Sequence, residues 1–88
     1  MSENGPTTAD RIRRVLSDHG RLSSDVQDLD LRDDLYQAGM TSHASVNVML
    51  ALEGEFDVEF PDAMLRRSVF ASIAAIEEAV VELLADPV

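Results

Sequence analysis

Ser42 and His43 are adjacent in the sequence and are the first pair of residues that could act as a nucleophile and its base. Neighbouring residues on a helix point about 100° apart, however, and seldom share the hydrogen bond that activates a serine. His43 and the other histidine, His19, also lie outside any cluster with the spacing of metal ligands. We therefore expect no catalytic residue and no metal site.

A run of aspartates precedes this pair, at positions Asp25, Asp28, Asp30, Asp33 and Asp34. The spacing lacks the alternating ligands, central glycine and closing glutamate of a calcium-binding loop. A solvated acidic loop is the simpler interpretation. A second acidic run, Glu53, Glu55, Asp57 and Glu59, is either a solvated face or a docking surface for basic partners.

Ser42 begins the segment with the strongest helical signal, residues 42–56. At about 100° per residue, the apolar side chains of this segment fall on two faces. The face predicted to enter the core holds Val48, Met49, Leu52 and Phe56. The neighbouring face holds Ser42, Val46, Leu50 and Glu53. A surface helix needs only one apolar face, so the second face is expected to contact a partner. A helix buried over one wide face would give the same pattern.

Three further segments have helical patterns. The first begins at a Thr7 or Thr8 cap, stops at Gly20 and places Ile12, Val15, Leu16 and His19 on one face. A short helix follows Pro61, with Asp62 as its cap. The last runs from a Ser72 cap to about Ala85. Between the first two helices, residues 21–40 are acidic and sparsely apolar, which predicts a long loop pinned across the bundle, with a tight turn at Gly39.

The predicted fold is therefore all-α, a four-helix bundle with a long loop between helices one and two and a short third helix. Residues 1–6 are expected to form a flexible tail, and residues 7–86 the single domain.

The charge and composition exclude several classes of protein. Seventeen Asp plus Glu residues against seven Lys plus Arg give a net charge of −10, which disfavours nucleic acid and predicts basic partners. The 45% apolar content is too high for a disordered acidic tail. No segment has the length and hydropathy of a membrane span, and residues 1–6 lack the basic region and apolar core of a signal sequence, so we expect no export. The absence of cysteine suits a reducing compartment, so we expect a soluble, cytoplasmic monomer.

Residues 51–62 read Ala-Leu-Glu-Gly-Glu-Phe-Asp-Val-Glu-Phe-Pro-Asp. This segment resembles the end of the second helix in the acyl carrier protein superfamily. The long acidic loop and the Gly-Met-Thr-Ser turn at 39–42, which precede it, also resemble that superfamily. The resemblance extends over roughly residues 7–84 and places Ser42 where that family has the serine of its Asp-Ser-Leu motif.

Three positions near Ser42 differ from the fatty-acid carriers of that superfamily. Thr41 stands for the usual aspartate, His43 for the usual leucine, and Asn47 for a common acidic residue. Residues 39–46 are more similar to the aminoacyl carrier proteins, which stand-alone relatives of class II seryl-tRNA synthetases load. The resemblance therefore implies poor docking to fatty-acid enzymes.

The resemblance implies a carrier without catalytic activity, which holds an amino acid or another acyl group as a thioester on 4′-phosphopantetheine attached to Ser42. Glycine or alanine is the expected cargo. The implied partners are a phosphopantetheinyl transferase, an ATP-dependent amino acid:carrier protein ligase and an acceptor that the sequence does not name. The residues then expected to bind partners are Thr41, His43, Val46, Asn47, Leu50 and Glu53.

Two alternatives stay open at this point. Ser42 could be a plain helix cap, the commonest role of a serine before an apolar periodic run. The chain could then be an acidic helical adaptor that binds a basic partner and carries no prosthetic group.

Overall fold

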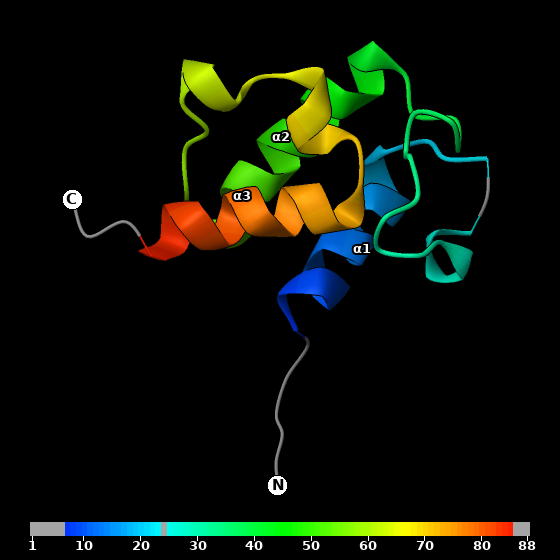
Figure 1. Cartoon of the computed structure of the whole chain (residues 1–88), viewed down its shortest axis with the longest axis horizontal. Coiled ribbons are helices and arrows are strands. Elements are labelled where there is room, and N and C mark those ends of the chain that lie inside the picture. The colour runs from blue at the N-terminus through cyan, green and yellow to red at the C-terminus, as the bar shows by residue number, and fades with distance from the viewer. Residues whose placement is uncertain (1–6, 24, 86–88) are drawn as a thin grey trace, which may run out of the picture.

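The computed structural model describes residues 7–23 and 25–85. Three α-helices, α1 (Thr8–His19), α2 (Ser42–Phe56) and α3 (Ile73–Ala85), pack around one core, with α1 in contact with both of the others (Figure 1). Three 3₁₀ helices lie in the connections: η1 (Val26–Asp28), η2 (Asp62–Met64) and η3 (Arg67–Phe70). No strand occurs in the described residues, which confirms the all-α prediction. The predicted tail, residues 1–6, and the predicted domain end at residue 86 lie outside them.

The predicted short third helix takes the form of two 3₁₀ turns. Leu65 separates η2 from η3 with a ψ of 63°, which is not helical, so neither turn grows into an α-helix. Pro61 rather than Asp62 occupies the capping position of η2, and its side chain makes no capping hydrogen bond. None of the helices in the described part of the chain is long and apolar enough to cross a membrane.

Helix α1 begins at the predicted cap. The Thr7 hydroxyl accepts the Asp10 N–H at 3.1 Å, and the Asp10 carboxylate accepts the Thr7 N–H at 3.2 Å. Ile12 and Leu16 are buried as predicted, but His19 is exposed. The prediction for His19 was wrong because α1 ends at this residue, and its ring is left in solvent.

The core joins all three α-helices and the long loop. Its largest fully buried side chains are Ile12, Leu16, Leu35, Val48, Leu52, Ile73, Ile76 and Val80. Complete burial of one such side chain contributes about 1.5–3 kcal/mol. Because Leu35 belongs to the loop, the position of the loop is set by the same packing that holds the helices together.

The loop of residues 21–40 is also fastened by hydrogen bonds. The Leu35 N–H donates to the Ala71 carbonyl at 2.7 Å, and the Ala74 N–H donates to the Leu31 carbonyl at 2.8 Å. The Arg13 guanidinium on α1 donates to the carbonyls of Val26 and Leu29 in the loop. The prediction that the loop is pinned across the bundle is confirmed.

Several of the loop aspartates serve its turns. The carboxylates of Asp25, Asp33 and Asp34 each accept a backbone N–H within the loop, from Gln27, Asp30 and Tyr36 respectively. Within residues 7–23 and 25–85, no group of three or more histidine or acidic side chains is placed to hold a metal ion.

Gly39 adopts the tight turn that the sequence predicts, with a φ of 117°. A Cβ atom there would lie 3.0 Å from the backbone nitrogen of Ser23. We expect Gly39→Ala to lower the free energy of unfolding by about 1–2 kcal/mol in urea titrations, because alanine adopts this backbone conformation only with strain. The matched control is Gly54→Ala in α2, whose new Cβ meets nothing within 4 Å and should stabilise the helix by up to about 1 kcal/mol. An equal loss of unfolding free energy in the two variants would contradict the conclusion that the turn at position 39 requires glycine.

Candidate functional site

Ser42 is the first residue of α2, and its side chain is exposed. The residue before it, Thr41, is the N-cap, and the Thr41 hydroxyl accepts the Ala44 N–H at 3.0 Å. The capping role that the sequence left open for Ser42 therefore belongs to Thr41. Among the described residues the Ser42 hydroxyl has no hydrogen-bond partner, so it is available to an external group.

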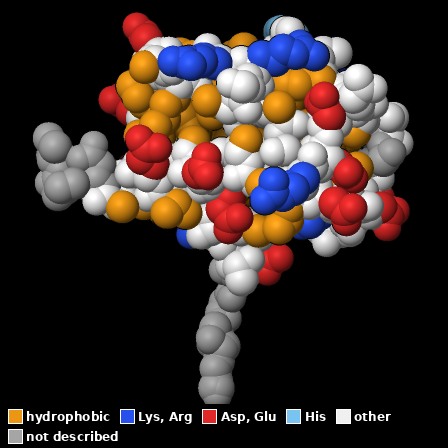
Figure 2. Space-filling view, viewed as in Figure 1, with side chains coloured by type: hydrophobic (Ala, Val, Ile, Leu, Met, Phe, Trp, Pro, Cys, Tyr) orange, Lys and Arg blue, Asp and Glu red, His pale blue; other side chains and the backbone are white. Residues whose placement is uncertain are grey.

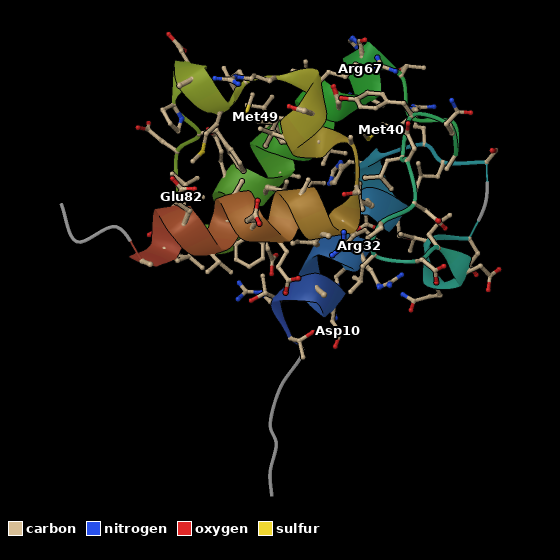
Figure 3. All side chains as sticks on the ribbon, viewed as in Figure 1. Asp10, Arg32, Met40, Met49, Arg67 and Glu82 are labelled. Carbon is tan, nitrogen blue, oxygen red and sulfur yellow. The ribbon has the colours of Figure 1, made fainter. Side chains whose placement is uncertain are left out.

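A groove with a volume of about 320 Å³ opens beside Ser42, between α2 and the η2–η3 segment. Its apolar lining consists of Val46, Met49, Leu65 and Phe70. Its polar lining consists of Ser42, Ser45, Tyr36, Arg66 and Arg67. Figure 3 shows Met49 beside η3 and Arg67 close to the start of α2. Ser42 thus stands at the edge of a site whose opposite wall comes from a different part of the chain.

The two apolar faces predicted for α2 are present. Val48, Leu52 and Phe56 are buried, whereas Val46 is 50% exposed and Leu50 is 55% exposed. Met49 was predicted for the core but is half-buried, because it lies between the two faces and lines the groove. The exposed face therefore begins at Ser42 and runs along α2 beside the groove.

The remaining predicted partner-binding residues separate into two kinds. His43 and Asn47 are exposed on α2, outside the groove lining. Glu53 is half-buried, and its carboxylate accepts the Phe60 N–H at 2.9 Å, which holds the segment after α2 against the helix. Glu53 thus has a structural role that the sequence did not indicate.

The groove wall opposite α2 was not predicted from the sequence. The Arg67 guanidinium lies 3.8 Å from the centre of the Tyr36 ring, a cation–π contact that joins η3 to the long loop. The Arg66 Nε donates to the Ala63 carbonyl at 3.0 Å. The sequence feature that could have indicated this wall is the Arg66-Arg67 pair, two adjacent cations in a chain with a net charge of −10.

The site suits a group that is attached through a phosphate. The N-terminus of a helix carries partial positive charge, which favours a phosphate placed there. The first turn of α2 contains no acidic residue, and two arginines line the adjoining groove. A phosphodiester at Ser42 would therefore lie in a locally positive environment.

A small acidic helical domain with an exposed serine at the start of a helix has the features of a carrier protein, a class that presents a prosthetic group and leaves the chemistry to its partners. Residues 10–80 match the family described as "Phosphopantetheine attachment site", and the chain belongs to this family. It is a carrier and not an enzyme, and its prosthetic group is phosphopantetheine.

Its relatives narrow the kind of carrier. An aminoacyl carrier protein of Agrobacterium fabrum is 49% identical over 69 residues, which cover 78% of this chain and 83% of that protein. A crystal structure of an engineered Bradyrhizobium japonicum glycine:carrier protein ligase, complexed with the carrier protein from Agrobacterium tumefaciens and ATP, contains a similar chain. That chain has a TM-score of 0.84 and 45% identity, over 86% of this chain and 99% of its own length.

A crystal structure of Bradyrhizobium japonicum glycine:carrier protein ligase with glycylated carrier protein gives a TM-score of 0.70 and 26% identity, over 82% of this chain and 96% of the matched chain. The predicted resemblance to aminoacyl carrier proteins is thereby confirmed, and the carrier prediction holds against the adaptor alternative.

Proposed function

We propose that Ser42 is the phosphopantetheine attachment site and that the protein carries an amino acid, glycine in the first place, from a ligase to an acceptor. The observation that carries the proposal is the exposed Ser42 hydroxyl at the start of α2, left free because Thr41 caps the helix. When bound, the prosthetic group supplies the sulfhydryl that holds the amino acid, which a chain without cysteine lacks.

The chain's own residues hold and expose this attachment point. The Thr41 cap fixes the first turn of α2, and the buried residues Val48 and Leu52 fix the helix on the core. Because the serine backbone is held on both sides, its side chain leaves the helix at a fixed point and faces solvent. His43, Val46, Asn47 and Leu50 are exposed on the same helix, where a partner that reaches Ser42 would meet them.

The relatives support both the cargo and the partners. Carriers with 45% and 26% identity occur in structures with glycine:carrier protein ligases, one of them glycylated. A ligase of this kind is the proposed loading partner, and a phosphopantetheinyl transferase is the proposed modifying enzyme. We place the protein in the cytoplasm, because its lack of cysteine suits a reducing compartment.

The attachment site is tested by intact mass. Incubation with coenzyme A and a broad-specificity phosphopantetheinyl transferase should add one phosphopantetheine, and peptide mass spectrometry should map it to Ser42. Addition at a different serine would overturn the assignment, and so would the absence of any addition.

The cargo is tested by a paired loading assay on the phosphopantetheinylated protein. A glycine:carrier protein ligase with ATP and radiolabelled glycine should load it at least about tenfold more efficiently than an acyl-carrier synthetase loads a fatty acid. His43→Leu combined with Asn47→Glu should shift the preference toward the fatty-acid enzyme, since it restores an apolar side chain and a charge beside Ser42. Efficient loading with fatty acid and none with glycine would reject the amino acid cargo while leaving the carrier role intact.

A further inference from the structure

The surface around Ser42 differs in charge from the protein as a whole. We define the Ser42 collar as the exposed residues Val46, Leu50, Leu65, Arg66 and Arg67. We infer that the Ser42 collar docks on an apolar surface edged with carboxylates, presented by the glycine:carrier protein ligase that loads the carrier. This inference rests on the proposed function and names the chemistry of its partner.

The apolar part of the Ser42 collar comes from two segments. Val46 and Leu50 on α2 are 50% and 55% exposed, and Leu65, between η2 and η3, is 46% exposed. Val46 and Leu65 line the same groove as Ser42. Exposed aliphatic side chains gathered in this way mark an interaction surface, because a partner that covers them removes their apolar area from water.

The charged part of the Ser42 collar is positive. Arg66 and Arg67 are exposed, and the ion pair found within residues 7–23 and 25–85 joins two other residues, Arg11 and Glu55. Arg66 and Arg67 therefore form no ion pair with a carboxylate in that part of the chain. Figure 2 shows arginine side chains along the upper edge of the molecule, next to hydrophobic side chains.

The groove and the start of α2 are free of carboxylates. None of the residues that line the groove is acidic, and the first turn of α2 contains no acidic residue. The first carboxylate on α2 belongs to Glu53, which is committed to the Phe60 N–H. Stacking on Tyr36 holds the Arg67 guanidinium in place at the rim of the groove. A cation fixed in this way selects a partner group of opposite charge at a defined position.

The overall charge of −10 led the sequence analysis to expect basic partners. Whole-protein charge governs approach from a distance, but the charges at the contact decide orientation and fit. The partner surface that complements the arginines beside Ser42 is therefore acidic. A strongly basic partner would face both arginines at short range, which would penalise docking at this site.

The test compares charge reversals of equal size at different places. Arg66→Glu and Arg67→Glu alter the Ser42 collar, and Arg14→Glu makes the same charge change on the exposed side of α1, outside the groove. The probe is the Bradyrhizobium japonicum glycine:carrier protein ligase. Two quantities are measured, the Kd for the apo carriers by calorimetry and kcat/KM for glycine loading of the phosphopantetheinylated carriers. Each reversal in the Ser42 collar should raise the Kd and lower kcat/KM by about tenfold or more. Arg14→Glu should change each quantity by less than about twofold.

Two further measurements separate charge from shape. Arg67→Lys keeps the charge and should keep most of the affinity, and circular dichroism should show that all variants are folded. The ratio of wild-type to Arg66→Glu affinity should approach one as the salt concentration rises to about 0.5 M, because salt screens the contact. A ratio that salt does not change would overturn the inference, because the lower affinity of Arg66→Glu would then come from altered shape and not from altered charge. Tighter binding by the glutamate variants, or equal effects at Arg14, would overturn it as well.

The outcome also separates this inference from the proposed function. If the wild-type protein takes up no phosphopantetheine at Ser42, the proposed function fails. If it takes up the group and the ligase loads every glutamate variant as well as the wild type, the carrier role stands and only the acidic partner surface is rejected.

Discussion

Replacing Ser42 with alanine should abolish phosphopantetheine addition completely and change the free energy of unfolding by less than about 0.5 kcal/mol. The loss of modification follows from the loss of the hydroxyl. The unchanged stability follows from the geometry, because the helix cap is Thr41 and alanine is a good helix former at the first helical position. On the sequence alone, a serine cap at position 42 would have cost about 1 kcal/mol on substitution. Intact mass and thermal unfolding followed by circular dichroism measure the two effects.

Thr41→Ala is the matched control and should give the opposite result. It removes the hydroxyl that accepts the Ala44 N–H, so it should lower the free energy of unfolding by about 1 kcal/mol. It leaves Ser42 in place, so phosphopantetheine should still be added. If Ser42→Ala destabilised the protein as much as Thr41→Ala does, the division of roles between the two residues would be wrong.

Leu52→Asp should unfold the protein. The Leu52 side chain is fully buried in the core, and a carboxylate placed there without a partner costs several kcal/mol, which approaches the total stability of a domain of this size. Val46→Asp and Leu50→Asp, on the exposed face of the same helix, should shift the melting temperature by only a few degrees. Both should reduce loading by the glycine:carrier protein ligase by about tenfold, because the new charge enters an apolar contact.

Circular dichroism and a loading assay on the three variants check this contrast. A neutral replacement, Val46→Ser, controls for the added charge, and it should lose less loading activity than Val46→Asp. Unfolding by Val46→Asp to the same extent as by Leu52→Asp would show that α2 does not have separate core and partner faces.

The features that the sequence predicted well are local. The Thr7 cap lies three residues from its partner Asp10, and the predicted Ser72 cap accepts the Ala75 N–H at 3.1 Å. The two faces of α2 follow from the helical period within 15 residues. Each of these predictions depends on residues within a few turns of one another, and that is the distance over which the helical pattern is informative.

The features that it missed depend on distant residues. The groove beside Ser42 brings Tyr36 from the long loop against Arg67 from η3, and no periodicity connects these segments. Glu53 matched the exposed face by its angle, but the chain turns after α2 and brings the Phe60 N–H to its carboxylate. Ser42 was predicted as the attachment site from the register of a familiar motif, but only the structure shows that Thr41, and not Ser42, caps the helix.

The contact between Tyr36 and Arg67 also has a spectroscopic consequence. Tyr36 is the single tyrosine in the chain, which contains no tryptophan. Tyrosine emission from this protein therefore comes from one ring, which lines the groove next to Ser42 and stacks on a guanidinium at 3.8 Å. The protein thus carries an intrinsic fluorophore in the groove beside the proposed attachment site, and we expect its emission to report occupancy of the groove in the unlabelled wild-type chain.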